Sequence, residues 1–264
     1  MSDAELISVK IDDRGIARLT LERPDAKNAL SVELMRQLHQ ATQTLAADDN
    51  GRAVVLSGAG DVFCAGGDLK GMQQQASGTR EGRVADASEF AATLRQLDQL
   101  PKPLIGRING SAFGGGVGLM SLCDITIGLS GAVYRLTEVT IGLVAATISP
   151  YVIGRIGASR ARRLMLHAVP VSGRSAHDLG LLDVVVDSAE ALDEAVEHEL
   201  AHVLECAPGA VARTKQLIRF VSTHDADANI DYTVTALADA WETEESREGI
   251  DSFLNRRKPG WRSP

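Results

Sequence analysis

Twice along the chain, a short apolar segment leads into a glycine-rich turn and then into a helical pattern. Residues 53–56 form the first apolar segment and precede the glycine-rich residues 57–71. Residues 104–108 form the second and precede the glycines at 114–116, and a third apolar segment follows at 124–129. Strands that alternate with helices favour an α/β fold, in which the loops after strands commonly carry function. The sequence therefore predicts an α/β core with its site at the glycine-rich turns.

The segments before and between these turns have readable patterns of their own. Alternating apolar residues at 7–11 and 17–21 flank a turn that contains Gly15, which is typical of a β-hairpin. Ser31 precedes a stripe of apolar residues at helical spacing and is a suitable N-cap. The polar residues 73–83 carry no such stripe, and we expect them to form a mobile surface loop.

The C-terminal part of the chain differs from the middle. From about residue 149 helical patterns predominate, interrupted by one predicted strand at 184–186. No linker of distinctive composition separates the two parts. We therefore expect residues 1–200 to form the core and residues 201–264 to form a helical region that packs on the core or on a neighbouring subunit.

Composition excludes several classes of protein. The chain has 264 residues, of which 44% are hydrophobic, and this is enough for one large core. Its net charge of −8 disfavours general binding to nucleic acid or to a membrane surface. The three cysteines (Cys64, Cys123 and Cys206) form no CxxC pair, which disfavours a disulfide framework or a zinc cluster. With no basic-then-apolar start and no long apolar run, we expect a soluble, cytoplasmic protein.

Two glycine-rich segments present backbone amides that a ligand can approach. In residues 62–70, paired glycines precede Asp68, whose ordinary role is to cap a helix. Residues 109–119 open a helix, where amides carry a partial positive charge suited to an anion or a developing oxyanion. A dinucleotide site is excluded because Gly114, Gly116 and Gly118 are spaced GxGxG rather than GxGxxG.

One carboxylate lies in an apolar setting. Glu138 stands among β-branched and apolar residues at 134–143. Such a group is ordinarily an ion-pair partner or a cap, but desolvation would raise its pKa and suit it to proton transfer. His198 and His202 have a metal-compatible spacing, yet their acidic neighbours indicate a solvated helix face.

The remaining candidate groups carry weaker signals. Cys64 lies beside glycines with no histidine placed near it by motif, so we interpret it as a small buried residue rather than a nucleophile. Arg160, Arg162 and Arg163 either contact a phosphate or form the outer face of a helix.

Together, five segments in order resemble the enoyl-CoA hydratase/isomerase (crotonase) superfamily over nearly the whole chain. They are LERPDAKNAL (21–30), LSGAGDVFCAGGDLKGM (56–72), INGSAFGGGVGLMSLCDI (108–125), LTEVTIGL (136–143) and EGIDSFLNRRKPGW (248–261). The resemblance implies a spiral of ββα turns with a C-terminal helical region that assembles trimers, often stacked into hexamers.

The resemblance also implies a site for an acyl-CoA thioester. Its carbonyl would be held by the amides of Gly67 and Gly115, with Glu138 as acid and base. Coenzyme A is then part of the substrate, and no separate cofactor or metal is implied. The implied CoA-binding residues are Lys27, Ala29, Ala65, Gly67, Asp68, Leu69, Lys70, Gly115 and, from the tail and toward a neighbouring subunit, Phe253 and Arg256.

The sequence departs from the family pattern at one catalytic position. Hydratases of this family use two glutamates; Glu138 matches the second, but Gly118 stands at the position of the first. We expect a hydratase in which Glu138 moves the protons, similar to the methylglutaconyl- or isohexenylglutaconyl-CoA hydratases. Two alternatives remain: a Δ3-Δ2 isomerase with Glu138 as the sole proton shuttle, and a CoA-ester-binding protein with weak catalysis.

Overall fold

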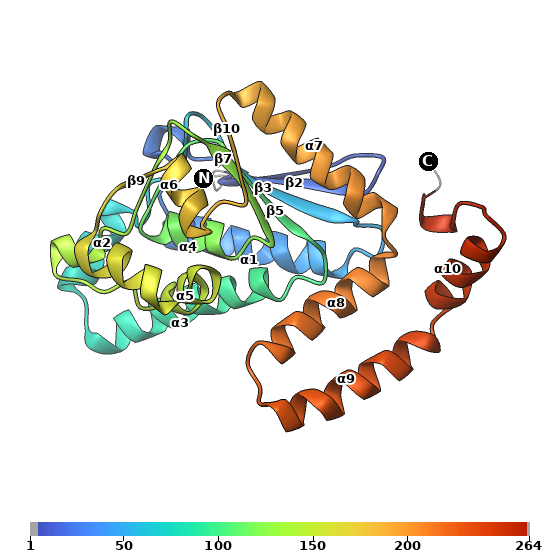
Figure 1. Cartoon of the computed structure of the whole chain (residues 1–264). Helices are drawn as coiled ribbons and strands as arrows, with labels where there is room; N and C mark the ends of the chain where they lie inside the picture. Colours follow the sequence, from blue (N-terminus) through green and yellow to red (C-terminus); the bar gives the residue numbers. More distant parts are fainter. Residues whose placement is uncertain (1–4, 263–264) are drawn as a thin grey trace.

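A computed structural model describes residues 5–262 and shows two β-sheets flanked by helices, with a helical arm at the C-terminal end (Figure 1). The strands are β1 (Ile7–Ile11), β2 (Ile16–Leu21), β3 (Ala53–Gly58), β4 (Val62–Cys64), β5 (Leu104–Ile108), β6 (Ser111–Phe113), β7 (Ile125–Leu129), β8 (Val133–Arg135), β9 (Val171–Ser172) and β10 (Val184–Val186). The predicted α/β class and the N-terminal hairpin are confirmed.

Ten α-helices and three short 3-10 helices are found within the described residues. The α-helices are α1 (Val32–Ala47), α2 (Leu69–Ser77), α3 (Arg80–Asp98), α4 (Gly115–Ser121), α5 (Ser149–His167), α6 (Gly173–Leu179), α7 (Ala189–Glu205), α8 (Pro208–Val221), α9 (Ala226–Trp241) and α10 (Glu244–Leu254). The 3-10 helices are η1 (Pro24–Ala26), η2 (Glu138–Ile141) and η3 (Gly260–Arg262). Ser31 caps α1 as expected, its side chain accepting a hydrogen bond from the Leu34 amide at 3.2 Å.

The two sheets are built together, one strand each per turn of the chain. The larger sheet has the order β1-β2-β3-β5-β7-β10 and the smaller has the order β4-β6-β8-β9. After each of β3, β5 and β7 the chain enters the smaller sheet as β4, β6 or β8 and then forms a helix. This arrangement is the spiral of ββα turns that the resemblance implied.

Helices bury both faces of the larger sheet. On one face Leu192, Val196 and Leu200 of α7 pack on residues of the central strands, such as Val55 and Ile105. The other face belongs to a larger apolar cluster that includes buried residues of α1, α3 and α4. The ends of the strands, where the chain passes between the sheets, are thereby held in a rigid frame.

One expectation about the organisation of the chain needs revision. Residues 73–83, expected as a mobile loop, form the end of α2 and the start of α3, with the Thr79 side chain capping α3 through the Gly82 amide. Leu200, at the expected boundary between the core and the helical region, is a buried residue of α7. The division of the chain into these two regions stays a prediction.

The last three α-helices form an arm that extends from the body (Figure 1). The arm returns at η3, where the Trp261 indole N–H donates to the Glu205 carbonyl at 3.2 Å and Arg52 donates to the Trp261 carbonyl at 2.9 Å. Many apolar side chains of the arm are exposed: Ile218, Val221, Ile230, Val234, Leu237, Trp241, Phe253 and Leu254. In the described part of the chain, no helix has the length and apolar character needed to cross a membrane.

Candidate active site

The site begins with two loops that run side by side. The amide of Ala65 donates to the Lys27 carbonyl at 2.9 Å, and the amide of Leu30 donates to the Gly66 carbonyl at 2.7 Å. The amide of Asp68 then donates to the Leu30 carbonyl at 3.3 Å. These bonds join the loop after η1 to the loop after β4, although the two lie far apart in the sequence.

Buried polar side chains hold this pair of loops in place. Asn28 is fully buried with a φ of 55°, and its amide nitrogen lies within 3.2 Å of the carbonyls of Ala59, Val62 and Phe63. Left-handed backbone is tolerated by asparagine better than by most residues. Asn28 lies between Lys27 and Ala29, two residues expected to bind CoA, but its side chain points into the protein and supports the loops.

An ion pair fixes the residue beside Gly67. Arg23 donates to the Asp68 carboxylate at 2.9 Å and to the Ala29 carbonyl at 2.7 Å. The Asp68 carboxylate also accepts the Gly71 amide at 3.1 Å and so caps α2, as predicted. Burial opposes its charge, but these hydrogen bonds outweigh burial and hold the pKa of Asp68 below its ordinary value.

The second glycine-rich turn packs directly on the first. A Cβ added to Gly66 would lie 2.7 Å from the Phe113 carbonyl oxygen, and one added to Gly116 would lie 2.6 Å from the Cys64 carbonyl oxygen. Real Cβ atoms essentially never approach other atoms so closely. Glycine at these two positions therefore lets two backbones touch, which brings the turns carrying Gly67 and Gly115 together.

Each turn contributes one amide without an acceptor. Within residues 5–262, no group of the chain accepts a hydrogen bond from the N–H of Gly67 or of Gly115. Gly115 is the first residue of α4, where an amide has no partner within the helix. Both residues line the same cavity, together with Glu138. Two main-chain donors and one carboxylate are thus available to one bound molecule.

The carboxylate of Glu138 sits against the second glycine turn. A Cβ at Gly114, whose φ is 48°, would lie 3.0 Å from its Oε1, so glycine leaves room for the carboxylate. Its Oε2 is buried and has no hydrogen-bond partner among the described residues. Burial raises the pKa of Glu138, and hydrogen bonds from the amides of Glu138 and Thr137 offset this only in part. The group is suited to accept and return protons.

No second carboxylate occupies the position that Gly118 marks. A Cβ on Gly118 would lie 2.3 Å from Cγ2 of Ile148, which is itself buried at the wall of the cavity. The space that a longer side chain would need is filled by an isoleucine. The missing glutamate is therefore replaced by apolar surface, and Glu138 has no carboxylate partner from this position.

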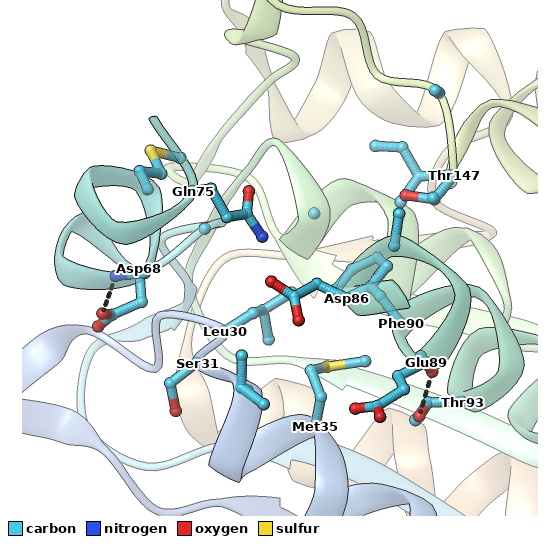
Figure 2. Close-up of a pocket in the computed structure, with 18 of the residues that line it drawn as sticks. Leu30, Ser31, Met35, Asp68, Gln75, Asp86, Glu89, Phe90, Thr93 and Thr147 are labelled. Carbon is cyan, nitrogen blue, oxygen red and sulfur yellow. Dashed lines mark hydrogen bonds between the residues drawn. The ribbon is translucent and has the colours of Figure 1, made fainter. Parts of the chain in front are cut away.

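A cavity of about 550 Å³ opens over these groups, and Figure 2 shows many of the residues that line it. The apolar lining residues include Leu30, Met35, Met72, Phe90, Ala145 and Ile148. The polar side chains come mainly from α2 and α3 and include Gln75, Asp86, Glu89 and Thr93, with Thr147 before α5. Gln75 was missed because residues 73–83 were expected to form a loop, and the polar residues of α3 were missed because helical periodicity does not show which polar face borders a cavity.

The residues expected to bind CoA lie in two separate places. Gly67, Asp68 and Gly115 line the cavity, and Ala29 and Ala65 belong to the paired loops beside it. Lys27, Leu69 and Lys70 are exposed next to the same loops. Phe253 and Arg256, in contrast, lie at the end of the arm and are absent from the cavity lining. The CoA-binding role of each residue stays a prediction.

The other candidate groups lie outside the cavity. Burial raises the pKa of Cys64 to about 12, so its thiol is not activated. His198 and His202 are exposed on α7 with their Nε2 atoms 3.3 Å apart, as the solvated interpretation predicted. Arg160, Arg162 and Arg163 are exposed on α5. Within residues 5–262, no three His, Cys, Asp or Glu residues gather as a metal site.

Known proteins resemble the chain along its length. The model of the enoyl-CoA hydratase/isomerase family matches residues 12–264. Enoyl-CoA hydratase ACTT6 of Alternaria alternata is 35% identical over 92% of this chain and 80% of its own. The mitochondrial Delta(3,5)-Delta(2,4)-dienoyl-CoA isomerase of Mus musculus is 30% identical over 96% of this chain and 80% of its own. The structure of Pseudomonas aeruginosa AtuE superposes with a TM-score of 0.94 at 34% identity, covering 98% of this chain and 100% of that one.

Proposed function

The chain belongs to the enoyl-CoA hydratase/isomerase family of enzymes, and on that premise we propose that it hydrates the double bond of an unsaturated acyl-CoA. One observation carries this proposal. The unpartnered amides of Gly67 and Gly115 and the half-buried carboxylate of Glu138 line a single cavity. Coenzyme A enters as part of the substrate, and no further cofactor is needed for the steps below.

The two amides polarise the thioester. When the thioester oxygen gains negative charge, it accepts hydrogen bonds from Gly67 and Gly115. These donors are already in place, so they stabilise the enolate more than the ground state, and each contributes about 3 kcal/mol in comparable sites. Both donors belong to the main chain; glycines at 66 and 116 let their two turns pack together, and the ion pair of Arg23 with Asp68 fixes the residue next to Gly67.

Glu138 carries the proton. In hydration its carboxylate accepts a proton from water as the water oxygen bonds to C3, and the electrons of the double bond move to the thioester as an enolate. Glu138 then returns the proton to C2: the C1=C2 electron pair of the enolate forms the new C–H bond, and an electron pair of the enolate oxygen re-forms the carbonyl. Because the pKa of Glu138 is raised, the free-energy difference between its charged and neutral forms at neutral pH is smaller than for an ordinary glutamate. This helps the group both to accept the proton and to return it.

Isomerisation is the second candidate, and one contact favours it. Because Ile148 fills the space beside Gly118, this position supplies no second carboxylate to hold an attacking water. A single base is sufficient for this reaction: it removes a proton from C2 of a 3-enoyl-CoA to give a dienolate, whose oxygen the same two amides can hold, and it returns the proton to C4. A named relative is an isomerase, whereas others are named hydratases, and the latter favour hydration as the first choice.

The paired loops are the proposed entry for the CoA part of the substrate. The exposed cations Lys27 and Lys70 stand beside them and are suited to the phosphates. Phe253 and Arg256 lie on the arm, so we propose that they reach the CoA of a neighbouring subunit rather than the cavity of their own.

The absorbance of the conjugated thioester separates the two reactions. Hydration of a 2-enoyl-CoA makes this absorbance fall, whereas isomerisation of a 3-enoyl-CoA makes it rise. We expect a fall with 2-enoyl-CoA and at least a thousandfold loss of kcat in Glu138→Gln, since that variant keeps the shape of the site but cannot accept the proton.

The affinity of Glu138→Gln for a saturated acyl-CoA is the control. It should stay within about threefold of the parent, because the amides and the paired loops are unchanged. A rise in absorbance from 3-enoyl-CoA alone would assign the isomerase instead. Binding without any turnover of either substrate would rule out both reactions and favour a binding protein.

A further inference from the structure

The cavity carries more negative charge than its chemistry requires. Asp86 and Glu89 of α3 line it together with Glu138, and none of the three forms an ion pair within residues 5–262. Asp86 is half-buried and its carboxylate has no hydrogen-bond partner among the described residues. Figure 2 shows the Asp86 carboxylate and the Gln75 amide reaching from α3 and α2 toward one another across the cavity.

The cations of the cavity do not neutralise this charge. Arg36 donates to both carboxylate oxygens of Glu33, at 2.9 and 2.7 Å, and is therefore engaged outside the acidic pair. His39 contacts Thr93 at 3.5 Å and Gln43 at 3.2 Å through its two ring nitrogens. The fourth carboxylate of the lining, Asp68, is already paired with Arg23.

The position of Asp86 places its charge along the path of an acyl chain. Phe90 follows Asp86 by one helical turn, and its ring lies 3.7 Å from the point where a Cβ on Gly115 would stand. Since the Gly115 amide would hold the thioester oxygen, the Phe90 ring borders the first carbons of the acyl chain. Asp86, about 6 Å back toward the start of α3, then meets a later part of the acyl chain.

We propose that the site selects acyl chains whose far end is uncharged and donates a hydrogen bond, such as a hydroxyl, with Asp86 as the specificity-determining acceptor and Gln75 as its neighbour. A terminal carboxylate on the acyl chain would face Asp86 and Glu89 without a free cation. A hydroxyl would satisfy the unpaired carboxylate of Asp86. The dicarboxylic acyl chains that the resemblance suggested are therefore disfavoured.

The inference rests on the proposed function, and a matched set of substrates tests it. Three 2-enoyl-CoAs of equal length would end in a methyl, a hydroxymethyl or a carboxylate group, compared at each of several lengths. We expect kcat/KM to be highest for the hydroxyl and at least about tenfold lower for the carboxylate, because like charges a few ångströms apart near a protein surface cost at least this factor.

Two variants test whether the preference for the hydroxyl end depends on Asp86. Asp86→Asn should reduce the preference for hydroxyl over carboxylate, measured as the ratio of the two kcat/KM values, by at least about fivefold. Glu81→Gln removes the same charge from the exposed first turn of α3, outside the cavity lining, and should leave the preference as it is. An equal loss for all three substrates in Asp86→Asn would overturn the proposal by making Asp86 catalytic or structural.

Binding measurements keep this inference separate from the reaction itself. Saturated acyl-CoAs with the same three ends cannot react, and calorimetry should rank their affinities in the same order. If no enoyl-CoA is turned over but this ranking holds, the proposed reaction fails and the selectivity stands. If the parent enzyme treats the three ends alike or prefers the carboxylate, the selectivity is wrong whatever the reaction.

Discussion

At the scale of single residues, Glu138 combines a chemical role with a cost to stability. Its carboxylate is half-buried with one oxygen unpartnered, and its pKa is raised above the ordinary 4.5. The folded protein therefore binds this proton more tightly than the unfolded chain does. As the pH rises from 4.5 through the raised pKa, the unfolded state loses its proton first, and the folded state loses stability relative to it.

This linkage predicts how Glu138→Gln affects stability. The glutamine stays neutral at every pH, so it avoids the cost of burying a charge. We expect the variant to unfold at a higher temperature than the parent at pH 7.5, with a smaller difference at pH 4.5. Thermal unfolding across this range measures the difference. A constant difference at all pH values would show that Glu138 keeps its ordinary pKa.

Individual residues also differ in whether their role in the site can be predicted from the sequence. Gly67, Gly115 and Glu138 were found because each stands in a motif with a specific order, and the structure brings them to one cavity. Asp86 and the supporting role of Asn28 were missed. Asp86 lies in a polar helix with no distinctive neighbours, and the hydrogen bonds of Asn28 reach residues 31 to 35 positions away. Such contacts exist only once the chain has folded.

At the scale of elements, the strands of the smaller sheet are too short to be predicted from the sequence. β4, β6 and β8 have three residues each, too few for alternation to show. They form because each pairs with a strand from another turn of the spiral. The start of α3 was mistaken for a loop because its first turns are exposed and polar, and its buried residues begin only at Thr93.

The caps of two neighbouring helices provide a test of the Gly67 amide. Asp68 caps α2 directly after Gly67, and Thr79 caps α3 away from it. Substitution of either by alanine should destabilise the protein by about 1 kcal/mol, the typical value of a cap. Only Asp68→Ala should also lower kcat, since it releases Arg23 and loosens the segment that carries the amide.

Unfolding in urea and steady-state kinetics on both cap variants measure these effects. The kinetic loss in Asp68→Ala should be partly recovered in Asp68→Asn, whose side chain keeps an acceptor for the Gly71 amide. Equal kinetic losses in the alanine variants of Asp68 and Thr79 would contradict a special role for the first.

The packing of α4 against the start of α5 gives a second prediction at this scale. Gly118→Ala should destabilise the protein by about 1 to 3 kcal/mol, because the added methyl would overlap Ile148. In Ile148→Ala the same change should cost much less, since the space has been vacated. A double-mutant cycle measures this coupling. Additive effects would mean that the two residues do not touch.

At the scale of the whole molecule, the arm is the part of the chain whose apolar side chains remain exposed when the chain is alone. Its helices α8 and α9 pair with each other, and the Phe220 and Tyr232 rings stack with centroids 3.8 Å apart. No residue of α9 is buried, and Ile230, Val234 and Leu237 are exposed. Apolar surface of this extent favours association with other copies.

The resemblance implies a trimer or two stacked trimers, and we expect the chains to associate through the exposed apolar residues of the arm. Light scattering coupled to size exclusion should give three or six times the chain mass of 28.0 kDa. Leu237→Arg on α9 should shift this mass toward one chain, whereas Asp178→Arg on the exposed face of α6 should not. A parent protein that runs as a single chain would refute the assembly.

The wall formed by α2 and the first turns of α3 has a consequence for how this enzyme acquires new preferences. α2 buries none of its residues, and the early part of α3 buries none before Thr93, yet both border the cavity. Substitutions there meet little of the hydrophobic core and carry a small stability penalty. Mutations in this stretch can therefore change which acyl groups bind without altering Gly67, Gly115 or Glu138. Mutant libraries restricted to this stretch are accordingly the most direct way to change the substrate.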